Sequence, residues 1–334
     1  MKKGVLLVNL GSPDSPSVKD VKKYLTQFLN DKYVIDINPI ARFFLVNFII
    51  VPTRSKNSAK LYEKIWTKEG SPLITHSKKQ KELLQKELGN DYVVELGMRY
   101  QNPSIKSAVK KLVEQKVESI TAIPLYPHWA SSSTESSIVE IKRVAKNIGF
   151  SNLKIIEKFY DDENYLNSLV GVASRYNMNE YDYFVFSYHG LPERQITKIY
   201  PNHCEVNDKC CSLISEKNKF CYRAACYYTT RELVKRLNIP EGKYISSFQS
   251  RLDDKWLKPY SDKVIEEKAK EGIKKILVFS PAFVSDCLET IYEISTEYNH
   301  LFIQNGGEKL HLVESLNENP KWISALKSLV LSAK

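Results

Sequence analysis

The fold is decided by the stretch Asp182-Tyr-Phe-Val-Phe-Ser-Tyr-His-Gly-Leu-Pro192. Its run of aromatic and β-branched residues predicts a buried strand that stops at His189-Gly190. The strand therefore ends in a sharp turn that carries an imidazole, and ligands of open α/β sheets bind at such carboxyl ends. The alternative is a structural histidine held by hydrogen bonds, which is the commoner case for one histidine after an apolar strand.

A second predicted strand, Lys275-Ile-Leu-Val-Phe-Ser-Pro281, leads into a segment that begins a helix and carries Asp286 and Glu289. A glutamate in the first turn of a helix is often only a favourable partner of the helix dipole. We therefore consider His189 and Glu289 as a pair. If this imidazole and this carboxylate share one site, a functional role is favoured for both.

Strands and helices alternate along the whole chain, and two pairs of strand-and-turn segments match in form. Residues 5–13 correspond to 184–192, and residues 120–124 correspond to 276–281. This pattern predicts an α/β protein with two similar doubly wound, Rossmann-like halves whose parallel sheets face an interdomain cleft. The expected parts are 1–157, 158–314 and a C-terminal helix in 315–334 that packs on the first half.

The composition is that of a globular protein with a large core, since 43% of the 334 residues are hydrophobic. The 49 Lys and Arg against 39 Asp and Glu give a net charge of +10. The lysines are scattered over predicted helix faces, and the sequence has no Arg-rich stripe and no aromatic nucleic-acid motif. We therefore expect a solvated basic surface and no nucleic-acid partner.

The apolar run after Lys2 and Lys3 is too short for a secretory signal and fits a first strand, so we expect a cytoplasmic protein. Residues 39–52 are strongly apolar and bracketed by Pro39 and Pro52. This segment is either a buried helix or loop, or an apolar lip that admits a flat substrate or contacts the inner face of a membrane.

Five of the six cysteines fall within residues 204–226. A disulfide knot is improbable in a reducing cytoplasm, and an odd number of thiols argues against it as well. Metal ligation is the better interpretation, with zinc and an iron–sulfur cluster both open, because the cysteine spacing matches neither a zinc ribbon nor a ferredoxin.

Taken together and in order, the motifs of the chain resemble those of the ferrochelatases, which insert ferrous iron into a porphyrin to make haem. The matching segments are Leu7-Val-Asn-Leu-Gly-Ser-Pro13, Met98-Arg-Tyr100, Pro124-Leu-Tyr-Pro-His128, Ser187-Tyr-His-Gly-Leu-Pro192, Phe248-Gln-Ser-Arg-Leu252, Ser280-Pro-Ala-Phe-Val-Ser-Asp-Cys-Leu-Glu289 and Ser315-Leu-Asn317. The resemblance implies iron insertion into protoporphyrin IX to give haem b, with loss of two pyrrole protons. It makes His189 the residue that binds Fe²⁺ or abstracts a proton, and Glu289 its acid/base partner from the opposite half of the molecule.

The resemblance also implies substrate-binding residues. Arg99 and Tyr100 match a pair near the porphyrin, and Arg99 would hold a propionate unless it forms a structural ion pair. Ser131 belongs to a polar loop with a helix cap as its alternative role, and Asp286 lies in the active-site segment. Leu10 stands where coproporphyrin-using relatives carry a tyrosine, which favours protoporphyrin IX.

Some members of the same family hold a [2Fe–2S] cluster on internal cysteines. By this resemblance the ligands are Cys204, Cys210, Cys211 and Cys221, with Cys226 in reserve. Two other functions stay open: a cobalt chelatase of the same fold, and a haem or porphyrin carrier that senses redox state through its cysteines.

Overall fold

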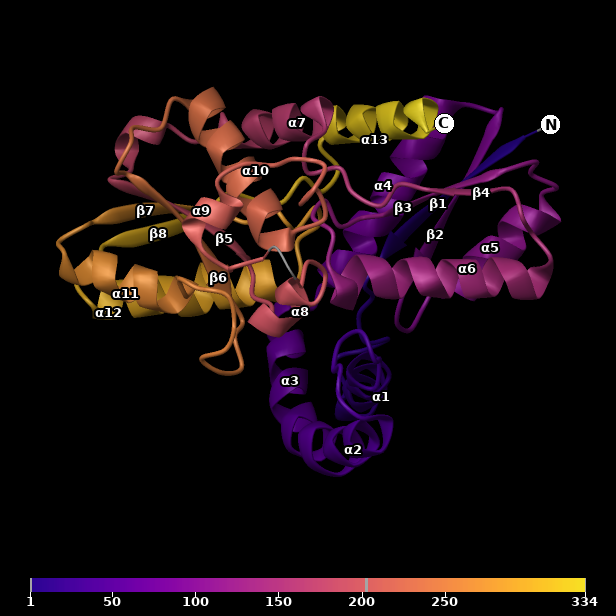
Figure 1. The fold of residues 1–334 in the computed structure, drawn as a ribbon, viewed down its shortest axis with the longest axis horizontal. Helices are drawn as coiled ribbons and strands as arrows, with labels where there is room; N and C mark the ends of the chain where they lie inside the picture. Colours follow the sequence, from indigo (N-terminus) through magenta and orange to yellow (C-terminus); the bar gives the residue numbers. More distant parts are fainter. Residues whose placement is uncertain (1, 202–203, 334) are drawn as a thin grey trace. The chain divides into compact units, whose positions relative to one another are not determined.

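This computed structural model describes residues 2–201 and 204–333 of the chain. The chain divides into two compact units, Met1–Glu157 with Trp322–Lys334, and Lys158–Lys321. Each unit contains one four-stranded parallel sheet, in the orders β2-β1-β3-β4 and β6-β5-β7-β8 (Figure 1). The two orders follow the same pattern, so the predicted α/β class with two similar halves is confirmed. Of the Cys-rich insertion expected at residues 201–228, Asn202 and His203 lie outside the described residues.

The first unit alternates strands and helices as the sequence pattern predicts. Its strands are β1 (Lys3–Asn9), β2 (Tyr92–Met98), β3 (Ile120–Pro124) and β4 (Leu153–Ile155). Its helices are α1 (Val18–Leu29), α2 (Pro39–Phe44), η1 (Leu45–Ile50), α3 (Val51–Ile65), α4 (Pro72–Leu88), α5 (Ile105–Glu114), η2 (Ser131–Glu135) and α6 (Ser136–Ile148).

The second unit repeats this plan. Its strands are β5 (Tyr183–His189), β6 (Tyr244–Gln249), β7 (Lys275–Phe279) and β8 (Lys309–Leu312). Its helices are α7 (Glu163–Ala173), η3 (Met178–Glu180), α8 (Glu193–Thr197), α9 (Asp208–Cys211), α10 (Tyr222–Leu237), α11 (Ser261–Lys270), η4 (Glu289–Tyr298) and α12 (Asn299–Gln304). The last helix, α13 (Pro320–Ser332), places Trp322 and the residues after it in the first unit.

The strands are apolar on both faces because helices cover both sides of each sheet. In β1 all of Val5, Leu6, Leu7 and Val8 are fully buried. One face of the first sheet packs against α5 and α6 through a cluster that includes Leu112 and Ile141. The corresponding face of the second sheet packs against α11, η4 and α12. This packing fixes η4, which begins at Glu289, directly on the second sheet.

The sequence pattern does not mark one edge strand of each sheet. The edge strands β4 and β8 have three and four residues, too few for an alternating or apolar run to register. Both pair only with the strand that precedes them in the sheet order, β3 and β7. His189 lies on β5, and the segment with Asp286 and Glu289 follows β7; these are the two central strands of the second sheet.

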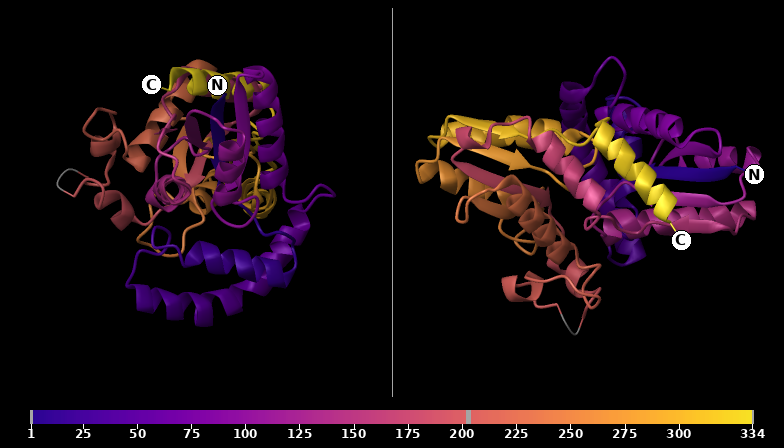
Figure 2. Two further views of the ribbon diagram at one scale, coloured as in Figure 1. Left: turned by 90° about the vertical axis from the view of Figure 1, so that its right-hand side faces the viewer. Right: turned by 90° about the horizontal axis from the view of Figure 1, so that it is seen from above.

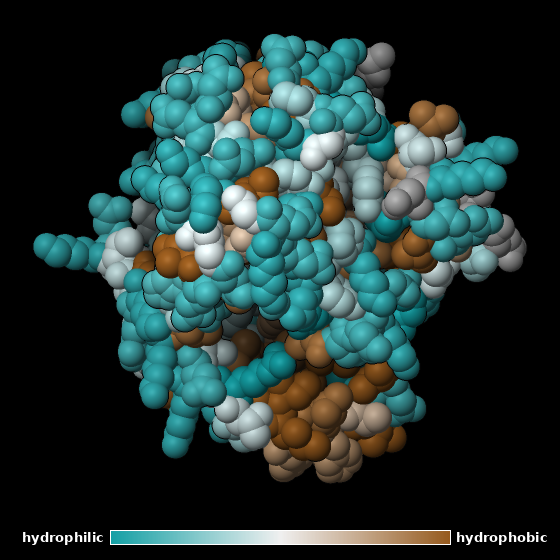
Figure 3. All heavy atoms as spheres, turned by 90° about the vertical axis from the view of Figure 1, so that its left-hand side faces the viewer, coloured by the Kyte–Doolittle hydropathy of each residue, from teal (hydrophilic) through white to brown (hydrophobic). Residues whose placement is uncertain are grey.

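The apolar segment 39–52 is helical and exposed, so the alternative of a buried segment is wrong. The elements α2, η1 and α3 follow one another without a break, beside α1 (Figure 2). The exposed fractions of Phe43, Phe44 and Phe48 are 52%, 57% and 65%, and Ile40 and Ile49 are also exposed. These five side chains, here called the apolar lip, form the brown patch at the foot of Figure 3. Among the described residues, no helix is both long and apolar enough to span a bilayer.

Candidate active site

His189 ends β5, and the turn after it is set by a close approach of two backbones. The N–H of Gly190 donates to the carbonyl oxygen of Gln249 at 2.8 Å, and a Cβ at Gly190 would lie 2.7 Å from that oxygen. Glycine is therefore required here. The half-buried imidazole lies with Nδ1 2.7 Å from the Gly190 carbonyl oxygen, and the Tyr222 hydroxyl donates to the backbone carbonyl of His189 at 2.9 Å.

Glu289 is the first residue of η4, and its carboxylate lies near the thiol of Cys287. Burial, followed by the neighbouring charge of Glu289, raises the pKa of the Cys287 thiol well above its ordinary value. Cys287 therefore stays protonated at physiological pH. The expectation that His189 and Glu289 come from opposite halves is wrong, because both lie in the second unit.

The sheet register brings His189 and the start of η4 to one edge of the second sheet. Strands β5 and β7 are parallel neighbours, with Phe186 level with Phe279, so their carboxyl ends share an edge. His189 is level with Gln249 on β6, and the next residue, Ser250, donates its N–H and hydroxyl to Glu293 of η4 at 3.0 and 2.6 Å.

The element η4 is a π-helix, a form that sequence periodicity did not predict. Its i→i+5 hydrogen bonding widens the helix, and such segments occur frequently at functional sites. Glu293 is held by Ser250 and by the Tyr298 hydroxyl at 2.8 Å. These contacts fix the helix four residues after Glu289 and leave the carboxylate of Glu289 itself at the helix start.

The predicted substrate-binding residues of the first unit also follow strand ends. Leu10 comes after β1, Arg99 and Tyr100 after β2, and Ser131 begins η2 after β3. The Tyr100 N–H donates to the Leu10 carbonyl oxygen at 2.9 Å, and Gly11 passes so close that a Cβ there would lie 2.0 Å from the Tyr100 oxygen. These backbone contacts fix the positions of Leu10 and Tyr100 relative to each other.

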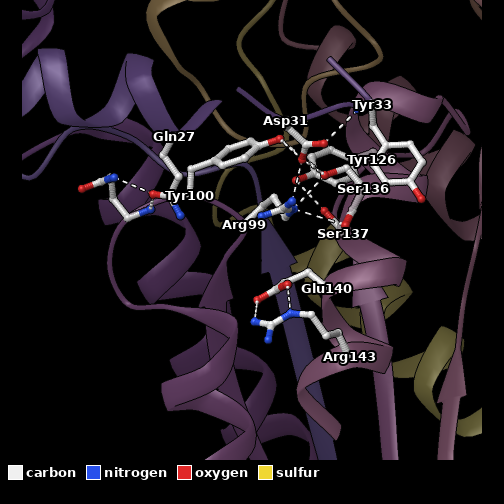
Figure 4. A network of polar contacts seen from close by, with 11 residues as sticks. Gln27, Asp31, Tyr33, Arg99, Tyr100, Tyr126, Ser136, Ser137, Glu140 and Arg143 are labelled. Atoms are coloured by element: carbon white, nitrogen blue, oxygen red, sulfur yellow. Dashed lines mark hydrogen bonds and ion pairs between the residues drawn. The ribbon is translucent and has the colours of Figure 1, made fainter. Parts of the chain in front are cut away.

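Arg99 forms the ion pair that was its alternative role (Figure 4). Its Nη2 lies 2.5 Å from Asp31 Oδ2, and its Nε donates to Ser136 Oγ at 2.7 Å. The same oxygen of Asp31 accepts from the Tyr100 hydroxyl at 2.8 Å and the Ser136 hydroxyl at 2.6 Å. Asp31 is 5% exposed, and sequence reasoning missed it because no local pattern marks a residue 68 positions from its partner. Burial, followed by the charge of Asp31, raises the pKa of Tyr100.

Four of the five clustered cysteines lie close enough to influence one another's thiol pKa values: Cys204, Cys210, Cys211 and Cys221. Cys221 and the Arg223 guanidinium lower the pKa of the Cys211 thiol, against the opposite effect of burial. Cys226 is fully buried, and burial raises its pKa well above the ordinary value.

These four thiols have the donor chemistry of an iron–sulfur or zinc site. In the described parts of the chain, however, no group of three or more His, Cys, Asp or Glu side chains is arranged to hold a metal ion. The thiols would therefore have to draw together around a metal.

The chain is similar to known proteins over nearly its whole length. The family model described as Ferrochelatase matches residues 2–334. A protein named Ferrochelatase from Coxiella burnetii (strain CbuK_Q154) is 45% identical over 332 residues, covering 98% of this chain and 93% of that protein. A Ferrochelatase from Opitutus terrae is 44% identical, covering 98% of this chain and 96% of that protein. In fold, the chain is similar to SirB from Bacillus subtilis with Fe³⁺, with a TM-score of 0.53 at 15% identity over 99% of this chain and 95% of that one. The chain belongs to the ferrochelatase family, whose members are metal-inserting enzymes.

Proposed function

We propose that this enzyme inserts ferrous iron into protoporphyrin IX and releases two pyrrole protons, which gives haem b. The observations that carry the proposal are that His189 ends β5, that Glu289 begins the helix after the neighbouring strand β7, and that the chain belongs to this family. Metal insertion needs a ligand that holds Fe²⁺ and then releases it, together with acceptors for two protons.

His189 supplies the nitrogen that meets the metal or takes a pyrrole proton. A carbonyl oxygen can only accept a hydrogen bond, so the contact with Gly190 places the imidazole proton on Nδ1. The lone pair on Nε2 is then available. Imidazole suits iron without the strong hold of a thiolate, so the metal can pass on to the porphyrin.

Glu289 accepts a proton as the macrocycle loses its pyrrole hydrogens. The protonated Cys287 thiol lies near this carboxylate.

The remaining predicted substrate contacts differ in what supports them. Leu10, Tyr100 and Ser131 follow strand ends, where ligands of α/β sheets bind. Arg99 and Asp286 have their hydrogen-bonding groups engaged by protein partners, which favours a role in positioning for both. A direct propionate contact of Arg99 stays a prediction.

We further propose a [2Fe–2S] cluster on Cys204, Cys210, Cys211 and Cys221. The support is that these four thiols lie close enough to influence one another's pKa, whereas Cys226 is fully buried. The cluster stabilises the segment of the chain that holds these cysteines. No step of the metal-insertion reaction is assigned to it.

The apolar lip is proposed to rest on the inner face of the membrane, which would put a cytoplasmic enzyme where it can exchange a greasy tetrapyrrole. Five exposed apolar side chains on one helical segment support this contact. Arg54 and Lys56 follow the lip in sequence and match the negative charge of phospholipid headgroups.

The test is anaerobic incubation of the purified protein with Fe²⁺ and protoporphyrin IX, followed by absorbance. We expect the haem spectrum to appear with many turnovers per protein molecule. Offering Co²⁺ with a corrin precursor tests the cobalt chelatase, and activity with that pair alone would contradict the proposal. A porphyrin carrier would bind stoichiometrically without forming haem.

A further inference from the structure

The start of η4 is fastened by two side chains that lie 31 residues apart in the sequence. The N–H of Asp286 donates to Asn317 Oδ1 at 2.9 Å, and Asn317 Nδ2 donates to Asp286 Oδ2 at 2.7 Å. The two bonds close a ring between one residue's backbone and carboxylate and the other residue's amide. This pair is called the Asp286–Asn317 clamp below.

The second oxygen of Asp286 is engaged as well. Oδ1 accepts from the Thr290 hydroxyl at 2.9 Å and from the Ser315 N–H at 3.3 Å. Thr290 Oγ1 in turn accepts from the Cys287 N–H at 3.0 Å. These bonds bracket Glu289, which lies between Cys287 and Thr290, and they satisfy a backbone donor at the beginning of the helix.

Asn317 is held in position by its own backbone. Its φ of 43° is in the left-handed region, which asparagine tolerates better than most residues. Its N–H donates to the Val284 carbonyl oxygen at 3.0 Å, and the preceding Leu316 is buried. The amide that grips Asp286 therefore projects from a rigid support.

We infer that Asn317 is a positioning residue for Glu289 that acts through Asp286. The inference rests on the proposed role of Glu289 as proton acceptor. A displacement of about 1 Å at a reacting group lowers the rate on the order of 10²-fold, so a helix start that shifts by that distance loses catalysis without losing its fold. Asp286 acts in the same way, since both of its oxygens are committed to the protein.

Exchanging the two side chains tests the clamp. Asp286→Asn alone removes one acceptor, because a carboxamide cannot accept both from Asn317 Nδ2 at one atom and from Thr290 and Ser315 at the other. Asn317→Asp alone sets two carboxylates against each other. The double variant restores every donor to an acceptor. We expect each single variant to lose kcat on the order of 10²-fold with KM for the porphyrin little changed, and the double variant to recover most of the loss.

Asn317→Gly keeps the left-handed backbone and removes only the amide, so it should fold, lose kcat and retain KM. The matched control is Asn319→Ala, which removes a nearby side chain that caps Lys321 at 2.9 Å, and it should leave kcat unchanged. If Asn317 acts through Glu289, adding Asn317→Gly to Glu289→Gln should not lower kcat further. If Asn317 is only structural, the two decreases in kcat should multiply.

Two results overturn the inference: wild-type kcat in folded Asn317→Gly, or a double exchange that is no faster than its single variants. Full activity of Glu289→Gln is a different result, because it contradicts the proposed role of Glu289 itself and removes the basis of the clamp. Loss of activity in Glu289→Gln with none in Asn317→Gly contradicts the clamp alone.

Discussion

Nδ1 of His189 lies 2.7 Å from the carbonyl oxygen of Gly190, the residue that follows it. The turn that ends β5 therefore also selects the tautomer of the imidazole, because only a protonated Nδ1 can make this bond. Gly190 cannot carry a side chain without meeting Gln249, so the same glycine shapes the turn and orients the histidine. Two adjacent residues, His189 and Gly190, therefore determine both the turn after β5 and the tautomer of the candidate catalytic imidazole.

The buried ion pair of the first unit should be a large contributor to stability. Asp31→Asn leaves the guanidinium of Arg99 without its charged partner, and Asp31 and Arg99 are only 5% and 17% exposed. We expect the free energy of unfolding in urea to fall by about 3 kcal/mol. The control Glu114→Gln breaks an exposed pair with Lys110 and should change it by less than about 1 kcal/mol. Equal effects of the two substitutions would contradict the interpretation.

His128 should make the protein sensitive to acid. Burial lowers the pKa of this fully buried imidazole to about 3, below the 6.5 of an exposed histidine. The unfolded chain therefore binds the proton first, and stability is lost as pH falls from 6.5 towards 3. Between those values the free energy of unfolding should drop by about 1.4 kcal/mol per pH unit through this residue.

Urea unfolding over that pH range checks this linkage. His128→Gln should flatten the pH dependence by the stated slope, although it lowers stability at neutral pH. His300→Gln, at an exposed position, is the matched control and should leave the slope as it is. An unchanged slope in His128→Gln would refute the linkage.

The apolar lip should govern binding to lipid vesicles. Phe44→Ser and Phe48→Ser remove exposed rings that contact each other, with centroids 5.7 Å apart. Each should weaken co-sedimentation with phosphatidylglycerol vesicles about tenfold. Leu331→Ser removes an equally exposed apolar side chain outside the lip and should have no effect. Equal binding of all three variants would rule out the lip as the contact.

The cysteine cluster should be visible by eye. If Cys204, Cys210, Cys211 and Cys221 hold a [2Fe–2S] centre, the protein purified without oxygen should be red-brown. It should contain about two iron atoms per chain, as such a cluster requires. Cys221→Ser should lose both colour and iron, whereas Cys226→Ser should keep them. A colourless protein with bound zinc, or with neither metal, would contradict the cluster.

Much of the fold was accessible from sequence because its signals are local. The apolar runs of β1 and β5 with their turns predicted two similar halves, and the strand end at His189 marked a candidate site. The edge strands β4 and β8 were missed because they are too short to show a period.

Contacts between distant segments left no such signal. Asp31 meets Arg99, and Asp286 meets Asn317, through side chains whose spacing follows neither a helical nor a strand period. The pairing of β5 with β7, which the structure shows, brings the carboxyl ends of these two strands to one edge of the sheet.

The central claim is that the imidazole of His189 carries iron insertion. The most direct measurement is the rate of haem formation by His189→Ala under anaerobic conditions with Fe²⁺ and protoporphyrin IX, alongside porphyrin binding followed by fluorescence. We predict that the variant binds the porphyrin as the wild type does and forms no haem. Haem formation at the wild-type rate by His189→Ala would contradict the account.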